Sequence, residues 1–105
     1  MAVEIITDND CKQVVETNSK VIVKYFAGWC GNCKLFAPKF RRLSEDARFK
    51  GVKFIDVNAE ENQEARQLAG VKNLPYFAIF REGRLVEGSA TSKEDVVVEL
   101  LSKLN

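Results

Sequence analysis

The sequence predicts an α/β protein with a central mixed β-sheet and helices on both faces. Strand-like and helix-like segments alternate along the 105 residues in the order β-α-β-α-β-α-β-β-α. Right-handed crossovers make the strands that are joined by helices parallel. The last two strands are separated only by residues 82–84, which favours an antiparallel hairpin. The length predicts a single domain over residues 1–105.

The first half of the chain alternates apolar strands with amphipathic helices. Residues 3–6 predict a short strand, and the acidic residues after them predict a helix over about 7–17. Residues 21–27 are almost continuously apolar, as in a central strand buried on both faces. Helical spacing then predicts a long helix over about 33–49, with an expected kink at Pro38.

The second half predicts strands at 52–57, 76–81 and 85–87, and helices at about 60–68 and 92–104. Asn58, with Glu61 three residues later, has the spacing of a capping box, and Gly70 predicts the end of that helix. Ser92 and Asp95 have the same spacing at the start of the last helix.

Composition and charge exclude several classes of function. Apolar residues make up 46% of the chain, which argues against disorder. The net charge is +1, so nothing in the charge favours binding to nucleic acid or to a membrane surface. No apolar run reaches the roughly 20 residues that span a bilayer, and residues 1–4 lack the features of a secretory signal. We therefore expect a cytoplasmic protein.

The chain has three cysteines and no histidine. An odd, small number does not fit a disulfide-stapled secreted domain. A zinc site needs four ligands, and only Cys11 could join Cys30 and Cys33, so we expect no metal. The lack of histidine excludes Cys-His catalysis and the common serine triads. We expect Cys11 to be a lone thiol without a catalytic role, the alternative being a regulatory or intermolecular disulfide.

Cys30 and Cys33 lie between the apolar strand and the long helix. Two cysteines at this spacing can close a disulfide, and the positive end of the helix dipole lowers the pKa of the first thiol. Lys34 adds a nearby positive charge. Because the thiolate is the attacking species in thiol–disulfide exchange, the pattern predicts redox chemistry. The alternative is a pair of core cysteines without chemistry.

Several motifs together make the chain resemble the thioredoxins over essentially its whole length. They are Trp29-Cys30-Gly31-Asn32-Cys33-Lys34, Pro38, Leu74-Pro75, Gly83 and Gly88. The resemblance implies the thioredoxin fold and a protein disulfide reductase, with Cys30 as the nucleophile and Cys33 as the resolving thiol. It implies no bound cofactor, because the Cys30–Cys33 pair itself carries two electrons.

The resemblance also implies a shallow docking surface. Pro75 would be a cis-proline that faces the disulfide, and the backbone of Leu74 would pair with an extended client segment. Trp29, partly exposed, would line this surface with Gly31, Val71 and Gly88. The alternatives are a trans loop proline, an apolar plug at Trp29 and a turn glycine at Gly88. The implied partners are disulfide-containing client proteins and a thioredoxin reductase, and we expect a monomer.

Three features depart from the family pattern. Asn32 stands where the family usually has proline, so we expect a less reducing couple. Lys24 stands where the family usually has a buried aspartate, and Asp56 where many relatives have lysine or glutamate. We hypothesise a charge-swapped Lys24–Asp56 pair beneath Cys33 that relays protons. The alternative is that both side chains reach solvent. The third departure is the stretch from Gly83 to Gly88, which is shorter than usual and makes the last hairpin tighter.

Three functions follow from these residues. The first is a general protein disulfide reductase. The second is an oxidase or isomerase with the same chemistry, shifted in potential by Asn32. The third is a binding module that keeps the fold without catalysis. The intact set of Cys30, Cys33, Trp29 and Pro75 favours the first. A glutaredoxin is disfavoured, because nothing in the sequence marks a glutathione site.

Overall fold

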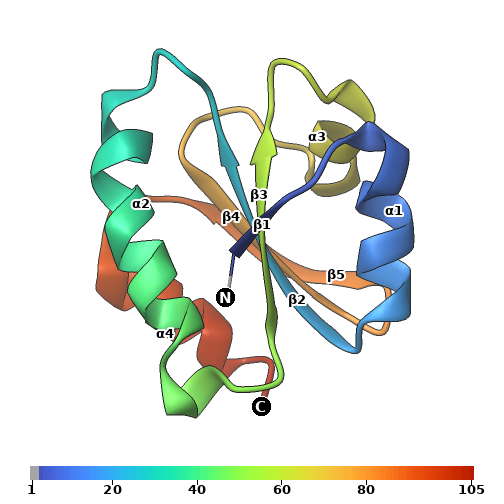
Figure 1. The fold of residues 1–105 in the computed structure, drawn as a ribbon, viewed down its shortest axis with the longest axis vertical. Helices are drawn as coiled ribbons and strands as arrows, with labels where there is room; N and C mark the ends of the chain where they lie inside the picture. Colours follow the sequence, from blue (N-terminus) through green and yellow to red (C-terminus); the bar gives the residue numbers. More distant parts are fainter. Residues whose placement is uncertain (1–2) are drawn as a thin grey trace.

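The computed structural model describes residues 3–105 and contains one five-stranded sheet (Figure 1). Met1 and Ala2, part of the segment analysed for a secretory signal, lie outside the described residues. The elements are β1 (Val3–Ile5), α1 (Asp8–Thr17), β2 (Lys20–Phe26), α2 (Gly31–Ser44), a 3-10 turn (Ala47–Phe49), β3 (Lys53–Asn58), α3 (Gln63–Ala69), β4 (Tyr76–Arg81), β5 (Arg84–Ala90) and α4 (Glu94–Ser102). Their order confirms the predicted one.

The strands follow the order β1-β3-β2-β4-β5, so β2 is central. β1 and β2 both run parallel to β3, whereas β4 is antiparallel to β2 and to β5. Figure 1 shows α2 and α4 on one face of the sheet and α1 and α3 on the other. The predicted mixed α/β architecture is therefore confirmed. None of the helices in residues 3–105 is long and apolar enough to cross a membrane.

The alternation of β2 divides the core into two layers. Val21, Val23 and Tyr25 pack with side chains of α1 and α3, while Ile22 packs with aromatic residues under α2 and α4. Successive side chains of a strand point to opposite faces, which places Lys24 on the same face as Ile22. A charged side chain therefore lies on the buried, aromatic side of the sheet, below the helix that carries Cys33.

The long helix ends earlier than predicted. α2 runs from Gly31 to Ser44, and Phe49 lies in the separate 3-10 turn. The Asp46 carboxylate accepts a hydrogen bond from the Arg48 backbone N–H (2.9 Å), which begins this new turn. Phe49 is nevertheless buried, so the apolar spacing that predicted the helix continues beyond the residue where the helix ends. Pro38 lies inside α2 as expected, and the kink there stays a prediction.

The predicted start of α3 is also wrong. The helix begins at Gln63, and the Asn58 side chain accepts from the Glu60 N–H (3.0 Å) in a turn before it. The Asp8 carboxylate, 57 residues away along the chain, accepts from the backbone N–H of Ala65 (2.8 Å). A capping contact from α1 thus replaces the local capping box. Gly70 ends α3 with a φ of +62°, as predicted.

The last two elements differ from the prediction in their limits. β5 extends to Ala90, beyond the expected 85–87. α4 begins at Glu94 after Lys93, so Ser92 is not its N-cap. The hairpin turn itself is two residues long, with left-handed φ values of 52° at Glu82 and 80° at Gly83. Positive φ values at both turn residues match the twist of two antiparallel strands. A positive φ is unfavourable for glutamate because of its Cβ atom, so Glu82 is strained.

We expect Glu82→Asn to raise the free energy of unfolding by roughly 0.5–1 kcal/mol, because asparagine tolerates a positive φ better. Gly83→Ala is the matched control and should lower it by about 1 kcal/mol. A Cβ at Gly83 would meet only ordinary contacts with Glu16, so the loss would be conformational. Urea denaturation measures both, and an Asn variant no more stable than the parent would contradict strain at Glu82.

Candidate active site

Cys30 and Cys33 form a disulfide where β2 gives way to α2, with their Cα atoms 5.2 Å apart. Cys30 is the N-cap of α2, and its Sγ accepts a hydrogen bond from the Cys33 backbone N–H (N–S distance 3.1 Å). The first sulfur thus receives both an N–H group and the positive end of the helix dipole. These two interactions favour negative charge on Cys30 Sγ once the disulfide is reduced.

The local chain explains how Cys30 comes to this position. The Cys30 N–H donates to the carbonyl of Ala27 (3.1 Å), which turns the chain out of β2, and the Lys34 N–H donates to the Cys30 carbonyl (3.2 Å) in the first helical turn. Cys30 is only 4% exposed. A Cβ at Gly31 would meet nothing within 4 Å, so open space adjoins the first cysteine.

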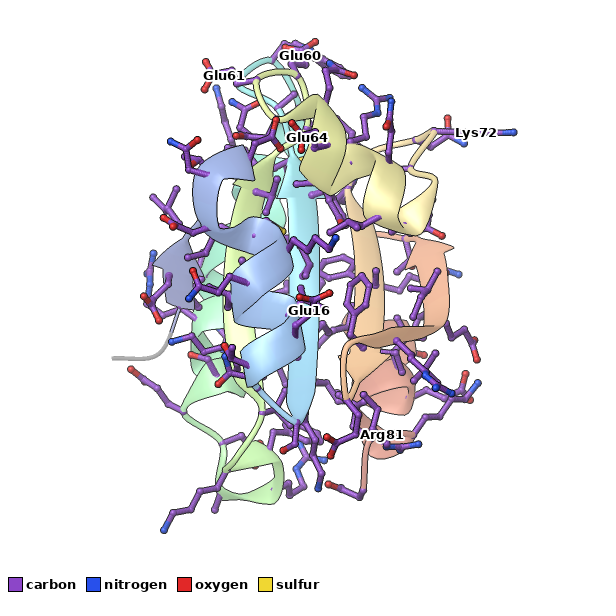
Figure 2. All side chains as sticks on the ribbon, turned by 90° about the vertical axis from the view of Figure 1, so that its right-hand side faces the viewer. Glu16, Glu60, Glu61, Glu64, Lys72 and Arg81 are labelled. Carbon is purple, nitrogen blue, oxygen red and sulfur yellow. A yellow bond between two sulfur atoms is a disulfide. The ribbon has the colours of Figure 1, made fainter. Side chains whose placement is uncertain are left out.

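Trp29 is 69% exposed, which confirms the expected partial exposure. Its Nε1–H donates to the Glu60 carboxylate (2.6 Å). Sequence reasoning missed Glu60, although the residue follows β3, whose carboxyl end lies at the same sheet edge as that of β2. Figure 2 shows Glu60 at one end of the molecule, close to Glu61 and Glu64. Glu60 therefore contacts the side chain of the residue that precedes Cys30.

The Leu74–Pro75 peptide bond is cis, as predicted. Leu74 packs against a small cluster of Ala27, Cys30 and Cys33, so the loop before β4 lies next to the disulfide. The carbonyl of Pro75 accepts a hydrogen bond from the Thr91 N–H (3.2 Å) at the end of β5. Thr91, which sequence reasoning did not single out, is therefore the β5-side neighbour of the cis-proline.

Val71 and Gly88, both expected on the docking surface, have packing roles in the structure. Val71 is 5% exposed and packs in the core with α1 and α3, so only its backbone could face a client. Gly88 pairs with Ala78, and a Cβ there would collide with the ring of Tyr76. Gly88 therefore makes room for the ring of Tyr76.

Lys24 and Asp56 form the predicted pair. They lie opposite each other on the parallel strands β2 and β3, with Lys24 Nζ 3.4 Å from Asp56 Oδ1. Lys24 is 3% exposed, so the alternative that it extends into solvent is wrong. Burial lowers the pKa of Lys24 and raises the pKa of Asp56, while each charge partly offsets the shift of the other. Burial thus brings the two proton affinities closer together.

A cavity of about 200 Å³ links this pair to the disulfide. Lys24, Asp56, Cys33 and Lys34 all contribute to its lining. Asp56 Oδ1 is buried and has no hydrogen-bond partner among residues 3–105. A carboxylate oxygen of this kind is a strong proton acceptor. Asn32 lies away from this cavity, exposed in the first turn of α2.

Cys11 lies in α1 on the other side of the sheet, and it is a free, buried thiol. Burial, together with the negative charge of Asp8, raises the pKa of Cys11 to about 11. The thiol is therefore protonated at neutral pH and a poor nucleophile. Across residues 3–105 there is no group of three or more side chains that could hold a metal ion.

Comparisons with known proteins agree with this geometry. The thioredoxin family model matches residues 2–103. A thioredoxin of Aspergillus fumigatus is 40% identical over 86 residues, covering 80% of this chain and 78% of the relative. The thioredoxin of Bacillus subtilis is 31% identical over 101 residues, covering 94% and 96% of the two chains.

Solved structures show the same fold. Spinach chloroplast thioredoxin f superposes with a TM-score of 0.89 at 25% identity, covering 98% of this chain and 93% of that one. Plasmodium falciparum thioredoxin gives a TM-score of 0.87 at 27% identity, covering 95% and 97%. With the family model, the relatives and a closed Cys30–Cys33 pair at the start of a helix, the chain belongs to the thioredoxin family and is a thiol–disulfide oxidoreductase.

Proposed function

We propose that this protein is a general reductase of protein disulfides, with Cys30 as the nucleophile and Cys33 as the resolving thiol. The observation that carries the proposal is the Cys33 N–H that donates to Cys30 Sγ at the start of α2. The same N–H can stabilise a Cys30 thiolate in the reduced protein. Lys34, one residue beyond Cys33, adds positive charge near the pair.

The reaction balances without a further cofactor. The Cys30 thiolate attacks a client disulfide, forms a mixed disulfide and releases the first client sulfur as a thiolate. Cys33 then loses its proton and attacks Cys30 Sγ, which releases the second client sulfur. The client gains two electrons, and the protein is left with the Cys30–Cys33 disulfide seen here. A bound prosthetic group is therefore not needed.

The resolving step needs a proton acceptor near Cys33, and we assign this role to Asp56. Asp56 and Cys33 line the same cavity, and Asp56 Oδ1, which lies 3.4 Å from Lys24 Nζ, makes no hydrogen bond within residues 3–105. Its raised pKa makes the carboxylate a stronger base than an exposed aspartate. Lys24 supplies a counter-charge that favours the ionised form of Asp56.

A client would bind around the exposed Trp29. Gly31 leaves open space next to Cys30, and Leu74 packs beside the disulfide ahead of the cis-proline Pro75. The backbone of Leu74 precedes β4 and is proposed to pair with an extended client segment. Val71 contributes its backbone alone, and Gly88 contributes through the packing of Tyr76.

We further propose a single-domain, cytoplasmic monomer over residues 1–105 that is kept reduced by a thioredoxin reductase and takes part in electron transport to client proteins. One structural neighbour was solved as a complex of ferredoxin:thioredoxin reductase with thioredoxin f2. Another comes from work on a yeast mitochondrial 1-Cys peroxiredoxin. Both support the class of partner. Asn32 supports the second candidate, an oxidase or isomerase, because the residue between the cysteines sets the redox potential.

Cys30→Ser should abolish the reduction of insulin disulfides, because it removes the attacking sulfur at the N-cap of α2. Cys33→Ser should instead accumulate a mixed disulfide between Cys30 and the client. Cys11→Ser is the matched control and should keep full activity, since its thiol is buried and protonated. If the Cys30→Ser variant kept its biological function, the protein would be a binding module.

Asn32→Pro should lower the reduction potential of the Cys30–Cys33 couple by roughly 20–50 mV, because proline stiffens the start of α2 and favours ring closure. The position lies in the first helical turn, where proline is tolerated. Asn32→Ala removes the polar side chain without stiffening the chain and serves as the control. Equilibration with glutathione measures each potential, and an unchanged or raised value for the proline variant would defeat this role of Asn32.

Asp56→Asn should slow the resolving step roughly ten- to hundredfold at neutral pH and remove its acid limb. In the parent protein the rate should fall as pH drops through the raised pKa of Asp56, since the protonated acid cannot accept a proton. Lys24→Met should shift that limb to higher pH, because the lost charge had lowered the pKa of Asp56. Stopped-flow kinetics across pH measures both, and an Asp56→Asn profile equal to that of the parent would refute the relay.

A further inference from the structure

The ammonium group of Lys24 has aromatic as well as charged neighbours. Its Nζ lies 5.3 Å from the ring centroid of Phe40 and 5.9 Å from that of Phe26. Both distances are within the roughly 6 Å over which a cation is attracted to an aromatic face. Phe40 comes from α2 and Phe26 from the end of β2, so two elements bring a ring to the same charge.

The Phe40 ring is held firmly in place. Phe40 is buried, and its ring lies 5.1 Å from that of Phe54 and 5.7 Å from that of Phe77, centroid to centroid. A ring packed in this way cannot turn its face away from Lys24 without disturbing the core. Because Lys24 is removed from water, the attraction to such a fixed face is stronger than at an exposed site.

The charged groups around Lys24 shift its pKa in opposite directions. Asp56 on β3 attracts the ammonium, whereas Arg41 on α2 repels it, and Lys34 lines the same cavity. Phe77, the partner of Lys24 on β4, brings no charge. Burial and Arg41 lower the pKa of Lys24, and Asp56 alone opposes them among these groups. Neutral Lys24 beside protonated Asp56 therefore competes with the ion pair.

We propose that Phe40, assisted by Phe26, is a positioning residue whose ring face keeps the buried Lys24–Asp56 pair in its ionised form. An aromatic face attracts an ammonium group but not a neutral amine. The proton therefore stays on Lys24, and Asp56 stays a carboxylate that can accept the proton of Cys33. This inference rests on the proposed relay and adds a further residue to it, on the same helix as Cys33.

Fluorination of Phe40 tests the inference with little change in shape. Single incorporation of 4-fluoro-, 3,5-difluoro- and 3,4,5-trifluorophenylalanine into the full chain weakens the negative ring face in steps. We expect the pKa of Lys24, followed by NMR of its side-chain nitrogen, to fall with each step. The resolving rate at neutral pH should fall with it, roughly two- to tenfold across the series.

The same series at Phe36 is the matched control. Phe36 is equally buried on α2 and packs 4.8 Å from Phe77, but its ring faces Lys39 rather than Lys24. This series should leave the pKa of Lys24 unchanged. Equal pKa values across the Phe40 series would overturn the role of Phe40. A falling pKa with an unchanged pH–rate profile would support the role of Phe40 and count against the relay.

Discussion

The chemistry of this protein depends on one contact, the hydrogen bond from the Cys33 backbone N–H to Cys30 Sγ. It exists because Cys30 is the N-cap of α2 and its side chain does what a serine or aspartate does at other helices. A cap on a sulfur differs from a cap on an oxygen, since the sulfur can ionise near neutral pH and exchange its bond. Helix stability and thiol reactivity are thus served by the same N–H.

A buried ion pair, Lys24–Asp56, lies on the strands beneath the cysteines. β2 ends at Phe26, four residues before Cys30, and two residues before its end it carries Lys24 on the face that α2 covers. The parallel register of β2 and β3 sets Asp56 opposite Lys24, and a cavity joins the pair to Cys33. A buried ion pair contributes little to stability on balance. Its position beside the resolving thiol is consistent with the proposed role in proton transfer.

Sequence reasoning predicted features that depend on local pattern or on strand register. The Lys24–Asp56 pair was predictable from the family resemblance, because these two positions usually carry charges of the opposite sign, and the strand register sets the two residues opposite each other. Contacts between distant segments were not predictable. The Asp8 carboxylate caps α3 across the fold, and Glu60 binds Trp29 from the loop after β3. The sequence also did not reveal that Gly88 leaves space for the ring of Tyr76, or that Thr91 adjoins Pro75.

The most direct test is the pKa of the Cys30 thiol in the reduced protein, followed by the ultraviolet absorbance of the thiolate. The Cys33→Ser variant isolates this titration, because the substitution keeps the backbone N–H that donates to Cys30 Sγ. The account predicts a pKa clearly below that of a free cysteine, about 8.5. A value at or above that of free cysteine would show that the start of α2 does not stabilise the thiolate, and the proposed mechanism would fail.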